Sequence, residues 1–285
     1  MTGALRLQGT LFCALALAVV AACALLRLAD GGAALAVVAV LIVVLGVPHG
    51  ALDTVFARRR LGVRSVAGWV GFAAGYLLLA AGVVGIWRLA PQVFLLGFLL
   101  LSAAHFAGDP VAGTRAASRA AYAGAVLILP ALFHEAEIAR LFAALAGPSD
   151  GLAHALHLLA WPWAMALAGC AAIEPRRTGA ELLAAGLLAA AAPPLIGFAV
   201  FFCAMHGARH ILRTAADMPA RALLVAGVAP MLGTLVLGAC AWFWLGDIAV
   251  DARLIQVVFV GLAALTVPHM ALIERARRDG WARGL

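Results

Sequence analysis

The sequence has few charged residues, and none of them is a lysine. Only 12% of its 285 residues are charged, whereas 66% are hydrophobic. A water-soluble chain of this length could not keep so many apolar side chains away from water. The composition therefore excludes a soluble domain and predicts a protein embedded in a lipid bilayer.

Cysteines with paired spacing are also absent. The five cysteines stand singly inside apolar runs, at Cys13, Cys23, Cys170, Cys203 and Cys240. Single cysteines in such runs are typical of small buried packing residues. We therefore expect no disulfide framework, and the near absence of thiolates argues against a structural zinc cage.

A continuous basic surface is lacking too, although the formal net charge is +7. The 20 basic residues are all arginines, and they fall in short clusters between long apolar runs. Such clusters orient transmembrane helices, whereas a nucleic-acid-binding protein needs a polar surface that carries a basic stripe. We expect no nucleic-acid partner.

Long apolar runs occupy most of the chain and predict its fold. Division at charged and Pro/Gly-rich points predicts an all-α, polytopic transmembrane bundle of about ten spans, with eight as the lower bound. The spans are expected at residues 8–28, 33–54, 67–88, 91–109, 117–134, 151–173, 179–193, 195–214, 222–245 and 253–274. The seventh is short and meets Pro193 and Pro194, so the seventh and eighth could form one broken or re-entrant element. We expect residues 1–285 to form a single integral membrane domain.

The arginines alternate between the two ends of these spans. One side receives Arg6, Arg58, Arg59, Arg60, Arg64, Arg115, Arg119, Arg176, Arg177, Arg213, Arg221, Arg275, Arg277, Arg278 and Arg283. The other side receives Arg27 with Asp30, Arg88, residues 134–137, the Pro-Pro turn, and Asp247 with Asp251. Because arginine-rich loops stay in the cytoplasm, both termini are expected there. The predicted location is the cell inner membrane, with multiple passes.

The eight histidines fall into two groups. Three of them, His134, His154 and His157, lie at the outer ends of the fifth and sixth spans and are expected to be interfacial side chains. The other five lie in the last turns of spans that all run inward: His49, His105, His206, His210 and His269. At 1.5 Å per residue, they lie roughly 5 to 15 Å before the next cytoplasmic arginine, so they share one membrane depth.

Residue spacing within the inner group indicates a metal site. His206 and His210 are four residues apart, so both project from one helix face and can reach a single ion. Asp53 and Asp109 each follow one of the histidines by four residues and are expected on the same face as that histidine. A carboxylate there can accept the proton of the second ring nitrogen of a ligating histidine, or ligate directly.

Neutral imidazoles suit iron, copper, nickel and zinc, and the spacing alone does not choose among these metals. A metal centre among apolar helices favours an enzyme that acts with oxygen on an apolar lipid. Two alternatives are a transporter of metal ions or protons, which needs a polar path to the outer face, and a haem-binding electron carrier with axial histidines. Cys203, one turn before His206, could add a ligand, although packing is the preferred interpretation.

Four segments resemble the signature segments of the Brp/Blh family of membrane β-carotene 15,15′-dioxygenases. They are Pro48-His49-Gly50-Ala51-Leu52-Asp53, Ala104-His105-Phe106-Ala107-Gly108-Asp109, Phe202-Cys203-Ala204-Met205-His206-Gly207-Ala208-Arg209-His210 and Pro268-His269-Met270. Their order and spacing match over nearly the whole chain. Two positions depart from the family pattern: Ala107, where glycine is more frequent, and Gly207, where serine is frequent.

The resemblance implies a non-haem Fe(2+) enzyme that adds O2 across the central 15,15′ double bond of β-carotene and releases two molecules of retinal. It further implies that the retinal commonly serves a microbial rhodopsin. Carried over to this chain, the iron ligands would be His49, His105, His206 and His210. His269 would be a fifth ligand or a neighbour of the site.

Overall fold

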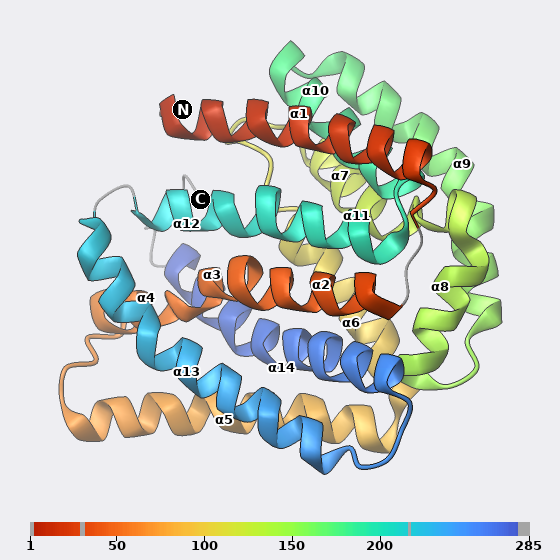
Figure 1. Cartoon of the computed structure of the whole chain (residues 1–285). Helices are drawn as coiled ribbons and strands as arrows, with labels where there is room; N and C mark the ends of the chain where they lie inside the picture. Colours follow the sequence, from red (N-terminus) through yellow and green to blue (C-terminus); the bar gives the residue numbers. More distant parts are fainter. Residues whose placement is uncertain (1–2, 29–31, 216–217, 279–285) are drawn as a thin grey trace.

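The computed structural model describes residues 3–28, 32–215 and 218–278, and within these ranges all regular structure is helical. Between its two ends a helix satisfies its backbone polar groups internally, as a chain without access to water requires. Figure 1 shows the long helices side by side, with the start of α1 and the end of α14 at the same end of the bundle. Asp30 and Arg283, which the predicted arginine alternation includes, lie outside the described residues.

The elements follow one another in a fixed order. They are α1 (Gly3–Leu26), α2 (Gly32–Leu41), the π-helix η1 (Ile42–Gly46), α3 (Pro48–Ala51), α4 (Asp53–Arg60), α5 (Val66–Leu89), α6 (Pro91–Phe106), α7 (Ala116–Ile128), α8 (Ala131–Ala146), α9 (Asp150–Ile173), α10 (Arg176–Ala191), α11 (Pro194–Val200), the π-helix η2 (Phe201–Gly207), α12 (Ala208–Ala215), α13 (Ala220–Trp244) and α14 (Val250–Arg278). Local signals set several helix boundaries. The hydroxyl of Ser65 accepts a hydrogen bond from the backbone N–H of Gly68 and caps the start of α5. Prolines stand at the first positions of α3 and α11.

The number of helices that can span a bilayer is smaller than the predicted ten. Seven helices among the described residues are long and apolar enough, and the bent pair α7–α8 raises the number to eight. All ten predicted runs coincide with helices, but α6 and α10 have only 16 residues each. At 1.5 Å per residue such a helix is about 24 Å long, shorter than a hydrocarbon core of about 30 Å. The helices have the length and composition of a multi-pass membrane protein, and the count of ten is not confirmed.

One helix was missed by the sequence analysis. The run predicted as a single span over residues 117–134 bends by 60° between α7 and α8, and α8 then continues to Ala146. The break falls at Pro130, because proline lacks the N–H that would continue α7. Residues 134–137, predicted as an outer loop, therefore lie inside α8, where His134 has non-helical backbone angles.

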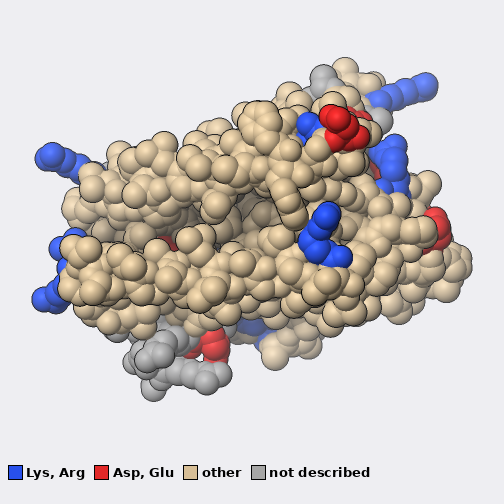
Figure 2. All heavy atoms as spheres, turned by 90° about the horizontal axis from the view of Figure 1, so that it is seen from below, with Lys and Arg blue, Asp and Glu red and all other residues tan. Residues whose placement is uncertain are grey.

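Two peripheral helices flank the part of the bundle that contains the histidines. The most apolar stretches of α5 and α13 have no buried residues, so these helices face outward. Both pack on α14, which also contacts α2 and α6. Figure 2 shows this side of the molecule as an almost uncharged surface with a hollow in its middle.

Candidate metal centre

Two π-helical segments position the histidines of α2–α4 and α11–α12. η1 ends three residues before His49, and η2 contains His206. A π-helical turn holds one extra residue and changes the direction of the side chains that follow, and such turns are frequent at functional sites. The two segments cross closely because Gly46 of η1 has no side chain: a Cβ there would clash with Cε1 of Phe202 in η2.

Five imidazole rings converge at this crossing, as the shared membrane depth predicted. The ring centroid of His49 lies 4.9 Å from that of His206, 5.4 Å from His269, 5.5 Å from His210 and 6.4 Å from His105. His105 and His206 are 4.5 Å apart, and His269 lies 5.2 Å from His105 and 5.1 Å from His210. Residues that are distant in the sequence thus form one buried cluster.

The nitrogen atoms of this cluster fit a metal ion. One ring nitrogen from each of His49, His105 and His206 lies within 4.8 Å of the other two, close enough for the three to share an ion. The Nε2 atoms of His105, His206, His210 and His269 are buried and have no hydrogen-bond partner among the described residues. Buried nitrogens without partners are costly, and a shared metal ion would satisfy them. The donors are all imidazoles, which suit iron, copper, nickel or zinc.

Hydrogen bonds at the other ring nitrogen orient three of the rings. Nδ1 of His49 lies 2.5 Å from the carbonyl oxygen of Gly46. Nδ1 of His206 lies 2.9 Å from Oδ1 of Asp109, and Nδ1 of His269 lies 2.7 Å from Oδ1 of Asp53. When Nδ1 donates to such an acceptor, Nε2 is left as the ligating atom.

The two carboxylates of the site bind histidines other than those that precede them by four residues. Each was expected on the helix face of the histidine four residues before it, but each accepts from a histidine of another segment. The reason is that neither stretch stays helical. The chain turns at Leu52 between α3 and α4, and α6 ends at Phe106, before Asp109. Both carboxylates lie within hydrogen-bond distance of a histidine Nδ1, and their role beside metal ligands stays a prediction.

Tyr76 is a site residue that the sequence analysis missed. Its hydroxyl lies 3.0 Å from Oδ2 of Asp53 and 3.2 Å from the carbonyl oxygen of Leu265. Tyr76, Asp53 and His269 therefore form a hydrogen-bonded chain from α5 to α14. The available signal was a tyrosine in the middle of an apolar run, because a buried phenol usually finds a polar partner.

An apolar cavity of about 340 Å³ lies against one side of the cluster. His49 and His269 line it together with residues of α5, α13 and α14, including Trp69, Phe72 and Leu262. A smaller pocket of about 80 Å³ contacts the other three rings and is lined by Asp109, Arg213 and Glu274 among others. The cluster can thus be reached from two sides, of which the larger is apolar and adjoins the hollow in Figure 2.

The three outer histidines do not join this cluster. Nδ1 of His134 lies 3.2 Å from a carboxylate oxygen of Glu137, and Nδ1 of His154 lies 3.0 Å from one of Glu135. His157 lies 3.5 Å from the other oxygen of Glu135, so a single carboxylate faces two half-exposed or exposed imidazoles.

Cys203 is not a member of the cluster either. Its thiol points at the carbonyl oxygen of Leu41, 3.4 Å away, and among the described residues it belongs to no group that could hold a metal ion. The packing interpretation therefore fits this residue better than ligation.

Comparison with known proteins identifies the family. A family model described as "Beta-carotene 15,15'-dioxygenase" matches residues 40–275, which include the five clustered histidines and both aspartates. The chain belongs to this family. A curated "Beta-carotene 15,15'-dioxygenase" from Uncultured marine bacterium 66A03 is 32% identical over 253 residues, which cover 82% of this chain and 90% of the relative. No solved structure matches the chain. The family resemblance inferred from the four sequence segments is confirmed, and the chain is an enzyme of a carotenoid dioxygenase family.

Proposed function

We propose that this family member is a non-haem iron dioxygenase that cleaves the central 15,15′ double bond of β-carotene with O2 and releases two molecules of retinal. One observation supports the proposal: Nε2 atoms without partners among the described residues converge beside an apolar cavity, in a bundle whose outer helices are long and apolar enough to span a membrane. A substrate dissolved in the bilayer can enter such a cavity without crossing water.

The proposed iron ligands are His49, His105, His206 and His210, with His269 as a fifth ligand or a neighbour of the site. When bound, Fe(2+) supplies the activation of dioxygen. The protein orients the imidazoles: Asp109 holds His206, and Asp53 holds His269. Nitrogen donors of one kind from several segments favour a transition metal over magnesium or calcium, which prefer oxygen ligands.

The cavity residues position the polyene and exclude water. Its aromatic and aliphatic walls provide contact for a hydrocarbon chain, and His49 with His269 marks the part of the cavity where the reacting bond must lie. Central cleavage replaces one C=C bond by two C=O bonds, and both oxygen atoms come from O2. The balance needs no proton and no external reductant, so no acid or base residue is required. Asp53, the only carboxylate among the lining residues, is already hydrogen-bonded to His269 and Tyr76.

We propose further that the protein is a single membrane domain of the cell inner membrane, with both termini in the cytoplasm. The start of α1 and the end of α14 share one end of the bundle, which supports a common side for the termini. Apolar β-carotene and O2 would reach the centre from the bilayer, and retinal would leave into it. A microbial rhodopsin is the proposed acceptor of that retinal.

Expression in a β-carotene-producing bacterium tests the function. Cells that express the protein should lose colour and accumulate retinal, whereas cells with an equal membrane level of His206→Ala should stay coloured. In ¹⁸O2, both oxygen atoms of the two retinal molecules should be labelled. Unequal aldehyde products would reject central cleavage, and label from water would reject the dioxygenase reaction unless exchange of the aldehyde oxygen explained it.

A further inference from the structure

The loop that follows His105 is held by arginine side chains through its backbone carbonyls. Residues 107–111, here called the 107–111 loop, connect α6 toward α7 and contain Asp109. The contacts are Arg119 to Ala107 (3.0 Å) and Val111 (2.7 Å), Arg213 to Gly108 (3.0 Å), Asp109 (2.8 Å) and Pro110 (3.4 Å), and Arg209 to Asp109 (3.2 Å). Five consecutive carbonyls thus accept from three guanidinium groups. A loop inside a membrane protein needs such donors, because its carbonyls lack helical partners.

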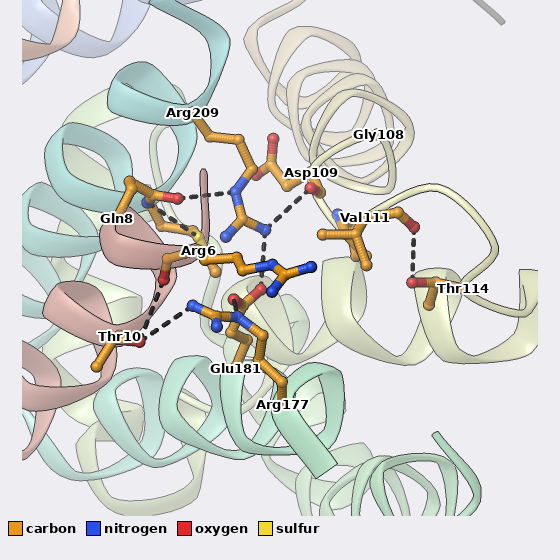
Figure 3. A network of polar contacts seen from close by, with 12 residues as sticks. Arg6, Gln8, Thr10, Gly108, Asp109, Val111, Thr114, Arg177, Glu181 and Arg209 are labelled. Atoms are coloured by element: carbon orange, nitrogen blue, oxygen red, sulfur yellow. Dashed lines mark hydrogen bonds and ion pairs between the residues drawn. The ribbon is translucent and has the colours of Figure 1, made fainter. Parts of the chain in front are cut away.

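Arg209 is the most deeply buried of the three arginines. It is 1% exposed, and Figure 3 shows its guanidinium between α1, α10 and the loop. Its Nε donates to Oε1 of Gln8 (3.0 Å), and its Nη1 donates to Oε2 of Glu181 (2.9 Å) as well as to the carbonyl of Asp109. Burial of a charge is costly unless it is paired and hydrogen-bonded, and Glu181 and Gln8 partner Nη1 and Nε of Arg209, while its Nη2 has no hydrogen bond among the described residues.

The loop connects Arg209 to the histidine cluster. Asp109 is 4% exposed, and its Oδ1 accepts from Nδ1 of His206. The position of the Asp109 backbone decides where this carboxylate lies. The carboxylate, in turn, decides the rotation of the His206 ring and the direction of its Nε2.

We propose that Arg209, assisted by Arg119 and Arg213, is a positioning residue of the metal centre. It fixes the 107–111 loop so that Asp109 holds His206 in its ligating orientation. Glu181 and Gln8 keep the guanidinium of Arg209 in place. The inference rests on the proposed histidine metal site, and it assigns the arginines no contact with substrate or metal.

Metal affinity and ligand geometry test this role apart from turnover. The full-length protein, purified in lipid nanodiscs and stripped of metal, is titrated with Co2+, whose visible absorption reports ligand number and geometry. Arg209→Met/Glu181→Met removes the buried charge pair together, which proteins often tolerate, and leaves the 107–111 loop without one donor. We expect folding near wild type, Co2+ affinity lowered about 10 to 100-fold, and an altered visible spectrum.

A mutant cycle with Asp109→Ala shows whether Arg209 acts through Asp109. The triple variant should bind Co2+ no more weakly than the weaker of its two parents. The proposal is overturned if the loss of Co2+ affinity in the triple variant equals the product of the losses in its two parents. Wild-type affinity in the folded Arg209→Met/Glu181→Met variant would also overturn it. If that variant does not fold, Arg213→Met tests the same role of the loop, because it removes three carbonyl contacts of the 107–111 loop. Wild-type Co2+ affinity in Arg213→Met would also reject the positioning role of the arginines.

Arg253→Met is a matched control. Arg253 likewise donates to loop carbonyls, those of Gly246 and Ile248, between α13 and α14 and away from the histidines. Its replacement should leave Co2+ affinity and spectrum unchanged, and an equal loss there would show that the arginine effect is not specific. Failure of the wild-type protein to bind Co2+ or Fe(2+) would instead remove the proposed metal site itself.

Discussion

Nδ1 of His269 lies 2.7 Å from Oδ1 of Asp53, although the two residues are 216 positions apart in the chain. The pair joins α14 to the first residue of α4, and both residues line the apolar cavity. Tyr76 of α5 donates to the second carboxylate oxygen. Three segments around the cavity are thus connected by one polar chain that ends at the histidine cluster.

The hydrogen-bonded series Tyr76–Asp53–His269 predicts that substitutions at its members lower enzyme activity to different degrees. Asp53→Asn should lower carotene cleavage about 10 to 100-fold, because an amide holds the imidazole of His269 less strongly than a carboxylate. Tyr76→Phe should lower it less, since Tyr76 contacts Asp53 at its second carboxylate oxygen and acts on His269 only through Asp53. Both expectations are checked by measuring turnover and bound iron for variants that are present in the membrane in equal amounts. A larger loss of activity in Tyr76→Phe than in Asp53→Asn would contradict the expectation that Tyr76 acts on His269 through Asp53.

The sequence predicted the histidine cluster because topology alone sorts histidines by depth. Four predicted inward spans carry the five histidines at one level, and histidines at one depth of a helical bundle lie close together. The partners of the carboxylates could not be predicted, since they depend on the turn at Leu52 and on the end of α6 at Phe106. Neither break follows from hydropathy.

Other features were missed for different physical reasons. α8 carries Glu135, Glu137 and Arg140 and therefore looked like a polar loop, although a bent helix can place such residues at an interface. Arg209 and Glu181 were left out of the arginine alternation, which considered only the ends of spans. Ionisable residues inside apolar runs often mark functional sites, so Arg209 and Glu181 could have been selected from the sequence.

The metal content gives a second prediction. The purified protein should carry about one iron per chain, without a haem absorption band, because the imidazoles converge on a single point. Metal analysis and a visible spectrum measure this. Zinc as the sole metal of an active preparation would defeat the assignment, as would a haem band.

The cavity gives a third prediction. Gly233 lines it, and a Cβ built there meets no atom within 4 Å, so Gly233→Leu should extend into the cavity without a clash in the bundle. We expect a rise in KM of about tenfold, equivalent to roughly 1.4 kcal/mol of lost binding, at unchanged iron content. Gly238→Leu is the matched control: Gly238 lies on the same helix, has the same free space and is not among the cavity's lining residues. Equal effects of the two variants would argue against the cavity as the substrate site.

The topology gives a fourth prediction. Reporter fusions at Gly62 and at the C-terminus should both report the cytoplasm, because arginines cluster at both positions. A fusion in the turn between α13 and α14, near Asp247, should report the opposite side. An outward location of either cytoplasmic fusion would require a different set of spans.

The last prediction separates the two groups of histidines. Alanine at His49, His105, His206 or His210 should abolish iron binding and carotene cleavage, because each change removes a proposed ligand from a buried site that has few other polar groups. Alanine at His134, His154 or His157 should leave activity near wild type, since their partners are the carboxylates of α8 and they do not join the cluster.

The comparison requires equal amounts of each variant in the membrane, so that a folding defect is not read as loss of a ligand. Iron content should fall only in the inner group, and thermal stability should fall there too if bound metal stabilises the folded state. His269→Ala decides the remaining role: loss of iron would make His269 a fifth ligand, whereas retained iron with lower turnover would make it a neighbour that shapes the cavity. Essential outer histidines together with dispensable inner ones would refute the topology and the metal site at once.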